Sequence, residues 1–504
     1  MKSLGVKVTF IVILTLLAGW LRLANLGAVN LYNDEFYQFE TAVGQLRLGE
    51  WVRYDYYNEG AGKVYDRAKL FIWQVAASIR LFGENETAGR LPAALWGTLL
   101  IPVVVLLLLR VLKHDWIAYG TGVVLLFDDL SIGLSRYVRM YSMLMVLVTL
   151  LVICVYLLFE AKLWKQRLAY GAVTAMALLL SLHIFKELTL AIIAALGVYA
   201  LLRAIAFIIT RHPSDKPWLY VWCVGAGLAA VAIALTLAGY NVVPLDAVIV
   251  RTKPHWSYLT DLFMSWRVPV LAGSLALIGL VLSFKQLRSF LGVAATVSTV
   301  VLTYFAFFSH RWDAQRYVSI IVPWVSLLTV VGLVASIQFI YGLLPKPVWL
   351  RRLLLLPLVF MIGPWLSFPG LPGNDLTHIT AKADYDTTEL GYADMRSAYA
   401  YVSEHVTAGE VVLMQGPRFY YWPNRQVPVY LMGGYKSLTL AEFKALAGRG
   451  TAGGWVVFNV THQRHLDDKI KAYMAKRFNY VSTLRDTNVV VYHFIPEDLA
   501  ERKK

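Results

Sequence analysis

The chain has 504 residues, of which 58% are hydrophobic and only 16% are charged, and its mean hydropathy is +0.56. So apolar a chain excludes a soluble globular protein of this length and indicates a multi-pass helical membrane protein. The net charge of +15 does not point to nucleic acid, because nearly all of the basic excess lies in the apolar part of the chain. The two cysteines, Cys154 and Cys223, lie inside apolar runs, so neither a disulfide nor a thiolate metal site is expected.

Apolar runs that suit membrane helices follow one another from the N-terminus to residue 366. The first run follows Lys2 and Lys7 and lacks a small-residue cleavage pattern, so we expect a retained helix rather than a removed signal peptide. About eleven transmembrane helices are predicted from these runs. Their ranges are 8–26, 89–109, 116–128, 137–159, 168–184, 188–208, 218–238, 268–284, 289–308, 317–341 and 349–366.

The distribution of charge predicts the orientation of these helices. With the N-terminus in the cytoplasm, the cytoplasmic segments hold only three acids, Asp115, Glu160 and Asp215. The same segments hold these basic residues: Lys2, Lys7, Arg110, Lys113, Lys162, Lys165, Arg167, Arg203, Arg211, Lys216, Lys285, Arg288, Lys346, Arg351 and Arg352. Short loops rich in lysine and arginine stay in the cytoplasm. We therefore expect an integral protein, most simply of a prokaryotic plasma membrane, with a cytoplasmic N-terminus and an extracytoplasmic C-terminal domain.

Residues 28–88 form one long first outer loop in this topology. Within the loop, the segment 69–82 has an uncharged run of about ten residues, half of what a helix needs to cross the ~30 Å apolar core of a bilayer. We therefore predict that it is an amphipathic helix on the outer surface. Aromatic residues crowd the loop: Tyr32, Phe36, Tyr37, Phe39, Trp51, Tyr54, Tyr56, Tyr57 and Tyr65. An interfacial aromatic belt is expected for most of them, and stacking of a few on a sugar or a lipid head group is the alternative.

Two adjacent carboxylates, Asp34 and Glu35, stand a few residues after the first predicted helix. An ionised group close to lipid is energetically expensive and is usually functional. A carboxylate held at the membrane surface is well placed to act as a general base on an acceptor at that surface.

A second acidic pair, Asp128 and Asp129, ends the third predicted helix, either as a polar helix end or as part of a site that also contains Asp34. Arg136 and Arg139 follow, three residues apart, and are expected on one face of a helix. Two guanidinium groups at the bilayer surface suit a phosphate, because each can bind two of its oxygens. Neutralisation of Asp128 or Asp129 is the structural alternative for the two arginines.

Three further polar segments fall on the same predicted outer face. His183 and Lys186 lie in a turn between two spans, where they either contact a phosphate or leaving group or are ordinary interfacial residues. His255 belongs to the loop 240–267, and Arg316 directly precedes the span 317–341. The topology places these segments on one side of the membrane, but the sequence does not show that they converge.

Together these residues suit chemistry on a lipid-linked phosphate. A carboxylate can deprotonate an acceptor hydroxyl while cations stabilise a departing lipid phosphate. The chain has no GxxxxGK[ST] loop and no glycine-rich dinucleotide motif after a strand, so a soluble nucleotide donor is not indicated.

The order of these motifs resembles the GT-C glycosyltransferases of the protein O-mannosyltransferase and lipid A aminoarabinose transferase type, over about residues 5–340. It is carried by Asn33-Asp34-Glu35, the run 81–92 (LFGENETAGRLP), Asp128-Asp129, the run 135–141 (SRYVRMY), and Arg316-Tyr317 with Pro323. Each motif is weak alone, and their order makes the resemblance specific. Relatives often have a proline step before the surface helix of the first loop, which residues 65–70 lack, so no subfamily's acceptor is carried over.

The resemblance implies transfer of a sugar, usually with inversion, from a polyprenyl- or dolichyl-phosphate donor to an acceptor outside the cytosol. It implies that Asp34, with Glu35 beside it, is the base or positions the acceptor, and that Asp128 or Asp129 is the second acid. The candidates for contact with the donor phosphate are Arg136, Arg139, Lys186, His183 and Arg316, and those for contact with the acceptor or sugar are Tyr37, Tyr57 and His255. Some relatives hold a divalent cation near the acids, but no spacing here demands a metal.

The C-terminal part alternates predicted helices and strands, which indicates a small α/β domain with a sheet covered by helices. Helices are expected at 394–405, 439–446 and 466–477, and strands at 410–414, 454–459 and 488–494. Residues 415–422 (QGPRFYYW) either contact a glycan acceptor or pack this domain on the membrane part.

The predicted fold class is therefore an α-helical multi-pass membrane protein of GT-C type with a C-terminal soluble α/β domain. The expected domains are 1–368 in the membrane and 376–504 outside the cytoplasm. The expected function is sugar transfer to a hydroxyl of a cell-envelope glycan or lipid, with protein as a further acceptor class. The alternative is a non-catalytic carrier or flippase of the same lipid, for which polar groups along the mid-membrane spans are typical.

Overall fold

The computed structural model describes residues 4–31, 34–237, 269–307, 315–343, 393–415, 418–424, 426–432, 438–459, 466–487 and 489–499. The chain forms two compact units. The first unit contains Met1–Leu26 and Asp66–Asp386, and the second contains Gly27–Tyr65 and Thr387–Lys504. The contacts thus group residues 27–65 with the C-terminal part, whereas the sequence-based division placed them in the membrane domain.

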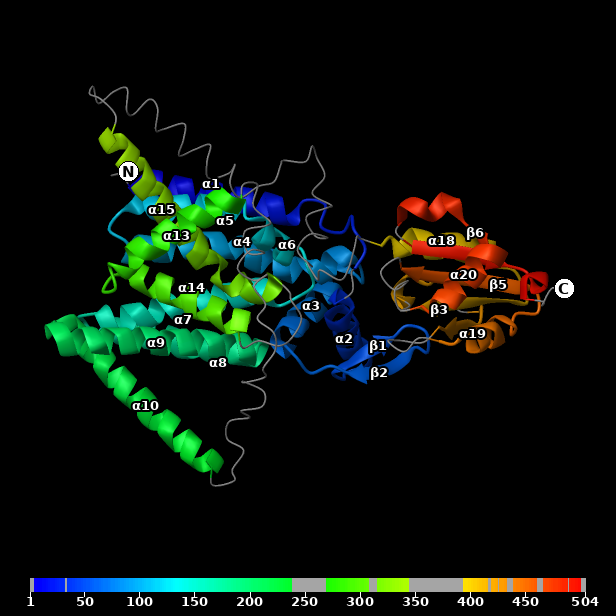
Figure 1. The fold of residues 1–504 in the computed structure, drawn as a ribbon, viewed down its shortest axis with the longest axis horizontal. Helices are drawn as coiled ribbons and strands as arrows, with labels where there is room; N and C mark the ends of the chain where they lie inside the picture. The colour runs from blue at the N-terminus through cyan, green and yellow to red at the C-terminus, as the bar shows by residue number, and fades with distance from the viewer. Residues whose placement is uncertain are drawn as a thin grey trace. The chain divides into compact units, whose positions relative to one another are not determined.

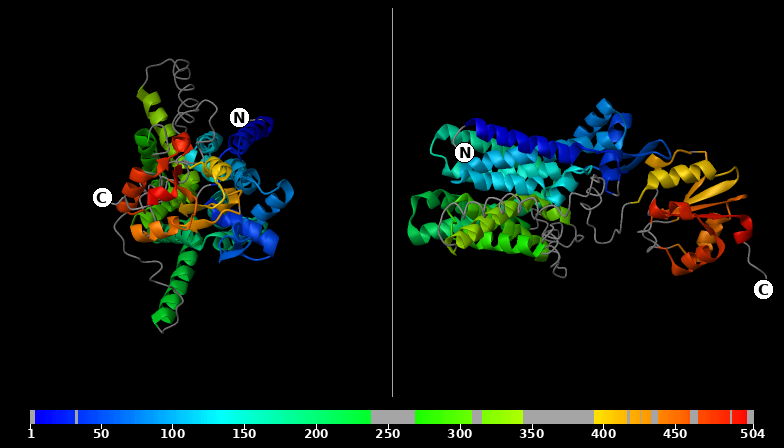
Figure 2. Two further views of the ribbon diagram at one scale, coloured as in Figure 1. Left: turned by 90° about the vertical axis from the view of Figure 1, so that its right-hand side faces the viewer. Right: turned by 90° about the horizontal axis from the view of Figure 1, so that it is seen from above.

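The first unit is a bundle in which most helices run side by side, while α10 turns away from the rest (Figures 1 and 2). Its described helices are α1 (Leu4–Leu23), α3 (Lys69–Phe82), α4 (Glu86–Val111), α5 (Asp115–Leu126), α6 (Asp129–Ser135), α7 (Tyr141–Glu160), α8 (Trp164–Ile184), α9 (Lys186–Thr210), α10 (Lys216–Leu237), α13 (Pro269–Phe284), α14 (Phe290–Phe307) and α15 (Val322–Leu343), with 3-10 turns η1 (Pro213–Asp215) and η2 (Gln315–Ile321). A helix lies at ten of the eleven predicted spans, and the eleventh, 349–366, lies outside the described residues.

Seven helices in the described part of the chain are long and apolar enough to cross a membrane. The pair α5 and α6 adds an eighth if it is one span, bent by 61°. The fold class of a multi-pass helical membrane protein is thereby confirmed, whereas the count of eleven spans is not.

The segment predicted to lie on the surface is a helix with the expected bounds, α3. Its residues Phe71, Ile72 and Val75 are buried, and the helix packs against α4. Trp73 and Leu81 are exposed by 60% and 75%. The apolar residues thus cover both the protein-facing side and part of the outer side of α3, as a helix at a lipid surface requires.

Two glycines bring the backbones of α13 and α15 together. A Cβ on Gly279 would meet the carbonyl oxygen of Leu328, and a Cβ on Gly332 would meet that of Leu275. Small residues at such crossings let membrane helices pack closely, because dispersion contacts replace the hydrophobic effect as the cause of association. A larger side chain at either glycine would force α13 and α15 apart.

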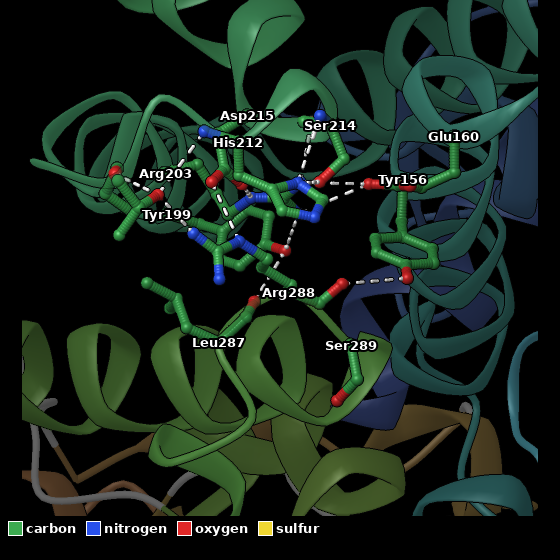
Figure 3. Close-up of polar contacts among 12 residues, drawn as sticks. Tyr156, Glu160, Tyr199, Arg203, His212, Ser214, Asp215, Leu287, Arg288 and Ser289 are labelled. Carbon is green, nitrogen blue, oxygen red and sulfur yellow. Dashed lines mark hydrogen bonds and ion pairs between the residues drawn. The ribbon is translucent and has the colours of Figure 1, made fainter. Parts of the chain in front are cut away.

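Buried and half-buried charges join three turns at one end of the bundle (Figure 3). The fully buried Arg203 of α9 donates to Asp215 of η1 at 2.5 Å and to Glu160 at the end of α7 at 3.2 Å. Asp215 also accepts a hydrogen bond from Arg288, in the turn between α13 and α14, at 2.8 Å. Tyr199 accepts from Arg203 at 2.8 Å and donates to a backbone carbonyl of that turn at 3.0 Å. The carboxylate of Asp215 therefore connects helices from distant parts of the sequence.

The second unit contains a five-stranded sheet in the order β4-β3-β5-β7-β6. β4 (Val429–Leu431), β3 (Glu410–Gln415) and β5 (Gly453–Asn459) are parallel, and β7 (Val489–Phe494) and β6 (Asn479–Tyr480) pair antiparallel. α18 (Met395–His405) covers one face, and α19 (Leu440–Ala447) and α20 (Asp468–Arg477) cover the other (Figure 2). Short turns η3 (Phe419–Tyr421) and η5 (Ser482–Thr487) and helix α21 (Pro496–Leu499) complete it. The predicted helices and strands of the C-terminal domain are confirmed.

The segment 27–65 adds a helix and a hairpin to this unit, and neither was predicted. The helix is α2 (Glu35–Leu48), and β1 (Val52–Asp55) pairs antiparallel with β2 (Gly60–Val64). Phe36, Phe39, Tyr54 and Tyr56 are buried. The expectation of an aromatic belt is wrong for these four rings, because they pack within the second unit, partly against the rings of η3.

Glu410 links three strands of the sheet. Its buried carboxylate pairs with Nε2 of His493 at 2.6 Å and accepts from Nε1 of Trp455 at 3.2 Å and from the backbone N–H of Thr407 at 2.7 Å. Burial alone would raise the pKa of Glu410, but these hydrogen bonds hold its pKa below the ordinary value.

Asp215→Asn is expected to destabilise the bundle, because it leaves the buried Arg203 with less compensating charge. Breaking a buried ion pair costs roughly 3–5 kcal/mol, so the thermal unfolding midpoint in detergent should fall by several degrees. Asp468→Asn is the control, since Asp468 is 95% exposed in its pair with Lys471. Equal midpoints for the two variants would contradict this account.

The stability of the sheet is expected to depend on pH through Glu410. A carboxylate whose pKa is lower in the folded state contributes stability above its unfolded pKa, about 4.3, and that stability is lost as the pH falls through the folded pKa. Hydrogen-exchange protection of β3 and β7 in the full chain should therefore fall on acidification below about pH 4.3. Glu410→Gln should flatten this dependence, and an unchanged profile would show that another group is responsible.

Candidate functional site

Asp34 and Glu35 lie at the start of α2, in the second unit. Asp34 is the residue before the helix, with φ −67° and ψ −19°, and its side chain makes no capping hydrogen bond to α2. Asp34 is half-buried, whereas Glu35 is completely buried. The positive end of the helix dipole favours a negative charge at this position. Of the two predicted carboxylates, Asp34 is therefore the more accessible one.

The two rings predicted to contact an acceptor differ in their surroundings. Tyr37 is 37% exposed, stacks on Tyr65 at 5.8 Å, and has the guanidinium of Arg53 4.5 Å from its ring centre. Arg53 also forms an ion pair with Glu40 at 2.6 Å. Burial raises the pKa of Glu40, although the charge of Arg53 acts in the opposite direction. Tyr57 instead stacks on a ring of η3 at 4.7 Å and accepts a backbone hydrogen bond from β4. Tyr57 is therefore used in packing, whereas the Tyr37 side chain stays partly exposed.

The second acidic pair lies in the first unit, at the bend between α5 and α6. Asp128 caps α6, because its Oδ1 accepts the backbone N–H of Ser131 at 2.7 Å. Asp129 is the first residue of the helix, and both acids are almost completely buried, at 1% and 4% exposure. The capping bond gives Asp128 a defined structural role, which the double acid in the sequence left open.

The prediction that Arg136 and Arg139 share one face of a helix is wrong. Residues 136–140 form a non-helical connection between α6 and α7. The fully buried guanidinium of Arg136 donates to four carbonyl oxygens at the end of α1, those of Leu21, Arg22, Ala24 and Asn25, at 2.7–3.3 Å. The last carbonyl groups of a helix have no hydrogen-bond donors within the helix, and the guanidinium of Arg136 supplies those donors. In this structure the guanidinium of Arg136 therefore holds the end of α1.

Sequence reasoning gave no role to two other buried arginines beside this end of α1. Arg22 is completely buried, donates to the Ser131 hydroxyl at 3.2 Å, and lies close enough to Asp128 for their charges to attract. Arg90 is completely buried and donates to the carbonyl of Leu26 at 3.0 Å. An arginine inside an apolar segment is rare and by itself indicates a specific structural or functional role. The sequence shows this feature at Arg22, which lies in the first apolar run.

Three polar segments of the first unit come together along a row of aromatic rings. Tyr141 lies 6.4 Å from Phe185, which lies 6.1 Å from Tyr317. We call these three residues the aromatic row. The guanidinium of Arg139 is 5.8 Å from the ring centre of Tyr141, and that of Arg316 is 5.5 Å from that of Tyr317. The structure thus brings both arginines to one row, a convergence that the sequence did not show.

Two further candidates flank Phe185 in the sequence. Lys186 is exposed at the first position of α9, directly after this member of the aromatic row. His183 is exposed in the last turn of α8, and the described residues provide its side chain with no hydrogen bond or ion pair to the row. His255 lies outside the described residues. Among the described residues, Arg139 and Arg316 therefore lie on the row, and the exposed Lys186 follows Phe185 in the sequence.

No metal site emerges from the part of the chain that the structure describes. No group of three or more His, Cys, Asp or Glu side chains there is arranged to hold a metal ion. The divalent cation left open by the sequence thus gains no set of protein ligands from these residues.

The comparisons with known proteins agree with this architecture. The family model described as dolichyl-phosphate-mannose-protein mannosyltransferase matches residues 59–260. ArnT from Cupriavidus metallidurans in the apo state is 16% identical, with 99% of each chain covered and a TM-score of 0.58. ArnT from the same organism bound to undecaprenyl phosphate is 14% identical, with 99% of this chain and 100% of that chain covered and a TM-score of 0.59. No curated protein sequence matches.

These findings confirm the resemblance predicted from the order of motifs. The family match covers the second half of the first outer loop and the helices that follow it, and the fold match covers nearly the whole chain. The protein is a multi-pass membrane protein with the fold of ArnT from Cupriavidus metallidurans.

Proposed function

We propose that this protein transfers a sugar from a polyprenyl-phosphate donor to an acceptor hydroxyl at the extracytoplasmic face of the membrane. The observation that carries the proposal is the fold shared over nearly the whole chain with ArnT from Cupriavidus metallidurans, which was solved with undecaprenyl phosphate bound. The family match to dolichyl-phosphate-mannose-protein mannosyltransferase supports the same class of donor. The N-terminus is cytoplasmic and the C-terminal domain extracytoplasmic in this proposal, as the charge distribution predicts.

The first unit supplies the groups for the donor phosphate. Arg139 and Arg316 lie on the aromatic row, and the exposed Lys186 directly follows Phe185 of the row in the sequence. Guanidinium and ammonium groups stabilise the charge that develops on a phosphate as it leaves. The apolar rings between them suit the prenyl chain that the phosphate carries. Arg136 has no part in this assignment, because its guanidinium is bound to the end of α1.

In the proposed reaction Asp34 is the general base. The acceptor oxygen forms a bond to the anomeric carbon of the sugar and loses its proton to the Asp34 carboxylate. The bond from that carbon to the phosphate oxygen breaks, and its electron pair leaves with the polyprenyl phosphate. Attack opposite the phosphate inverts the anomeric configuration. The sugar is a hexose or a pentose, and the preferred acceptor is a cell-envelope glycan or lipid.

Asp129 is the second acid of the proposed site, in preference to Asp128. The carboxylate of Asp128 caps α6 and lies near the charge of the buried Arg22, so its loss disturbs the bend between α5 and α6. Asp129 stands at the first position of α6 with its side chain outside the capping bond.

The function is tested by measuring sugar transfer with the purified protein in detergent, using a panel of polyprenyl-phosphate sugars and envelope extracts. Asp34→Asn is expected to lower the transfer rate by roughly 10²–10⁴-fold, the typical contribution of a general base, while binding of undecaprenyl phosphate persists. Asp66→Asn is the matched control, because Asp66 is an exposed aspartate of the same loop. Donor binding without transfer in any acceptor mixture, with Asp34→Asn indistinguishable from the parent, would favour a carrier or flippase.

The two acids at the bend are separated by a second pair of variants. Asp128→Asn is expected to lower the thermal midpoint, because the buried Arg22 loses a neighbouring negative charge, while asparagine retains the capping oxygen. Asp129→Asn is expected to lower the transfer rate at least ten-fold with an unchanged midpoint. The assignment is reversed if Asp128→Asn loses transfer at an unchanged midpoint and Asp129→Asn retains it.

A further inference from the structure

We propose that Tyr421 of the C-terminal part, assisted by Asp394, is a positioning residue for the carboxylate of Asp34. The proposal rests on the proposed function, in which Asp34 is the base. Tyr421 belongs to η3 and Asp394 precedes α18, and both lie in the second unit together with Asp34. The sequence assigns Asp394 no role in the site, and it leaves residues 415–422, which include Tyr421, as either a contact with a glycan acceptor or a packing segment against the membrane part.

The first contact holds the chain at Leu31, three residues before Asp34. The backbone N–H of Leu31 donates to the hydroxyl of Tyr421 at 2.6 Å. Leu31 is only 4% exposed, so water does not readily replace this partner. A buried backbone N–H without an acceptor costs free energy comparable to a lost hydrogen bond. The position of Leu31, three residues before Asp34, is therefore set by a side chain from the C-terminal part.

The second contact holds the neighbouring residue. Nδ2 of Asn30 donates to Oδ1 of Asp394 at 2.8 Å, and Asn30 is 2% exposed. Asp394 is itself immobilised, because its two oxygens accept from the backbone N–H and the hydroxyl of Ser397 at the start of α18. Burial alone would raise the pKa of Asp394, but the hydrogen bonds from Ser397 and Asn30 lower it, so the carboxylate is ionised and a strong acceptor at neutral pH.

The third set of contacts holds the chain just after the acidic pair. The ring of Phe36 meets that of Tyr421 edge-on at 6.0 Å, and the guanidinium of Arg418 lies 4.9 Å from the centre of the Phe36 ring. The ring of Phe39 meets Tyr420 at 5.1 Å. Both phenylalanines are buried, so their rotamers are fixed by this packing. Asp34 and Glu35 thus lie between two segments that contact the C-terminal part, one at residues 30–31 and one at residues 36–39.

The consequence for the reaction is geometric. A general base works only within hydrogen-bond reach of the proton that it removes, and an error of about 1 Å can cost about 10²-fold in rate. Asp34 makes no capping hydrogen bond that would fix its side chain on α2. The contacts of Tyr421 and Asp394 with the segments on either side place the backbone that carries Asp34. The C-terminal domain contributes to the rate in this proposal without contacting the sugar.

The test uses the full-length protein and Tyr421→Phe, which removes the hydroxyl and keeps the ring. Tyr480→Phe is the matched control, since Tyr480 is 44% exposed on β6. Hydrogen exchange of the segment 27–48 is expected to be roughly ten-fold faster in Tyr421→Phe and unchanged in the control, because the Leu31 N–H loses its acceptor. The kcat for transfer should fall at least ten-fold while the KM for the polyprenyl-phosphate donor stays as in the parent.

Two outcomes would overturn the proposal. In the first, exchange of the segment 27–48 and kcat in Tyr421→Phe match the control. In the second, exchange rises equally in β3 and β5, which would show general destabilisation of the C-terminal domain. Asp394→Asn provides an independent check, with faster exchange again confined to 27–48 and the N-terminus of α18. A parent protein that transfers no sugar would refute the proposed function, whereas the exchange pattern separately decides whether Tyr421 orders the segment.

Discussion

The four hydrogen bonds from Arg136 to the carbonyls that end α1 are the interaction on which the arrangement of the first unit depends. A helix end in an apolar environment needs partners for its last carbonyls, and water is not available there to supply them. Arg136 meets that need from the connection after α6, and Arg90 does the same for Leu26 from α4. One buried guanidinium thus fixes the end of α1 relative to the connection between α6 and α7.

The helices of the first unit could be predicted because they are long apolar runs, and hydropathy alone finds such runs. The broken span could not be predicted in the same way. Residues 116–128 read as one helix that ends in two acids, whereas the structure ends α5 at Leu126 and starts a short α6 at Asp129, with a 61° bend. The chain turns there because Asp128 caps a new helix, a choice that depends on Ser131 and Arg22 rather than on local hydropathy.

The C-terminal elements were also predictable, because their strands and amphipathic helices carry local signals, including the cap at Asp394 and the capping box at Thr439. Helix α2 was not predictable, because its sequence lacks a strong pattern of apolar residues at helical spacing. Its buried rings are covered by residues from the C-terminal part of the chain. The site shows the same division. The sequence offers Asp34 and Asp128-Asp129 as candidates, and only the fold separates Arg139 and Arg316, which lie on the aromatic row, from Arg136, which holds the end of α1. Residue type identifies a cation, whereas its partners determine what it does.

The composition of the second unit has a consequence for biosynthesis. Its two parts, Gly27–Tyr65 and Thr387–Lys504, are separated by the whole of Asp66–Asp386. At about 5–20 residues per second, a ribosome needs roughly 15–65 s to make that intervening stretch. During this time Phe36 and Phe39 exist without the rings of Tyr421 and Tyr420 that later cover them. The helix that carries the acidic pair therefore reaches its final packing only after the last domain has been synthesised, so a truncated or stalled chain leaves this apolar surface open to aggregation or proteolysis.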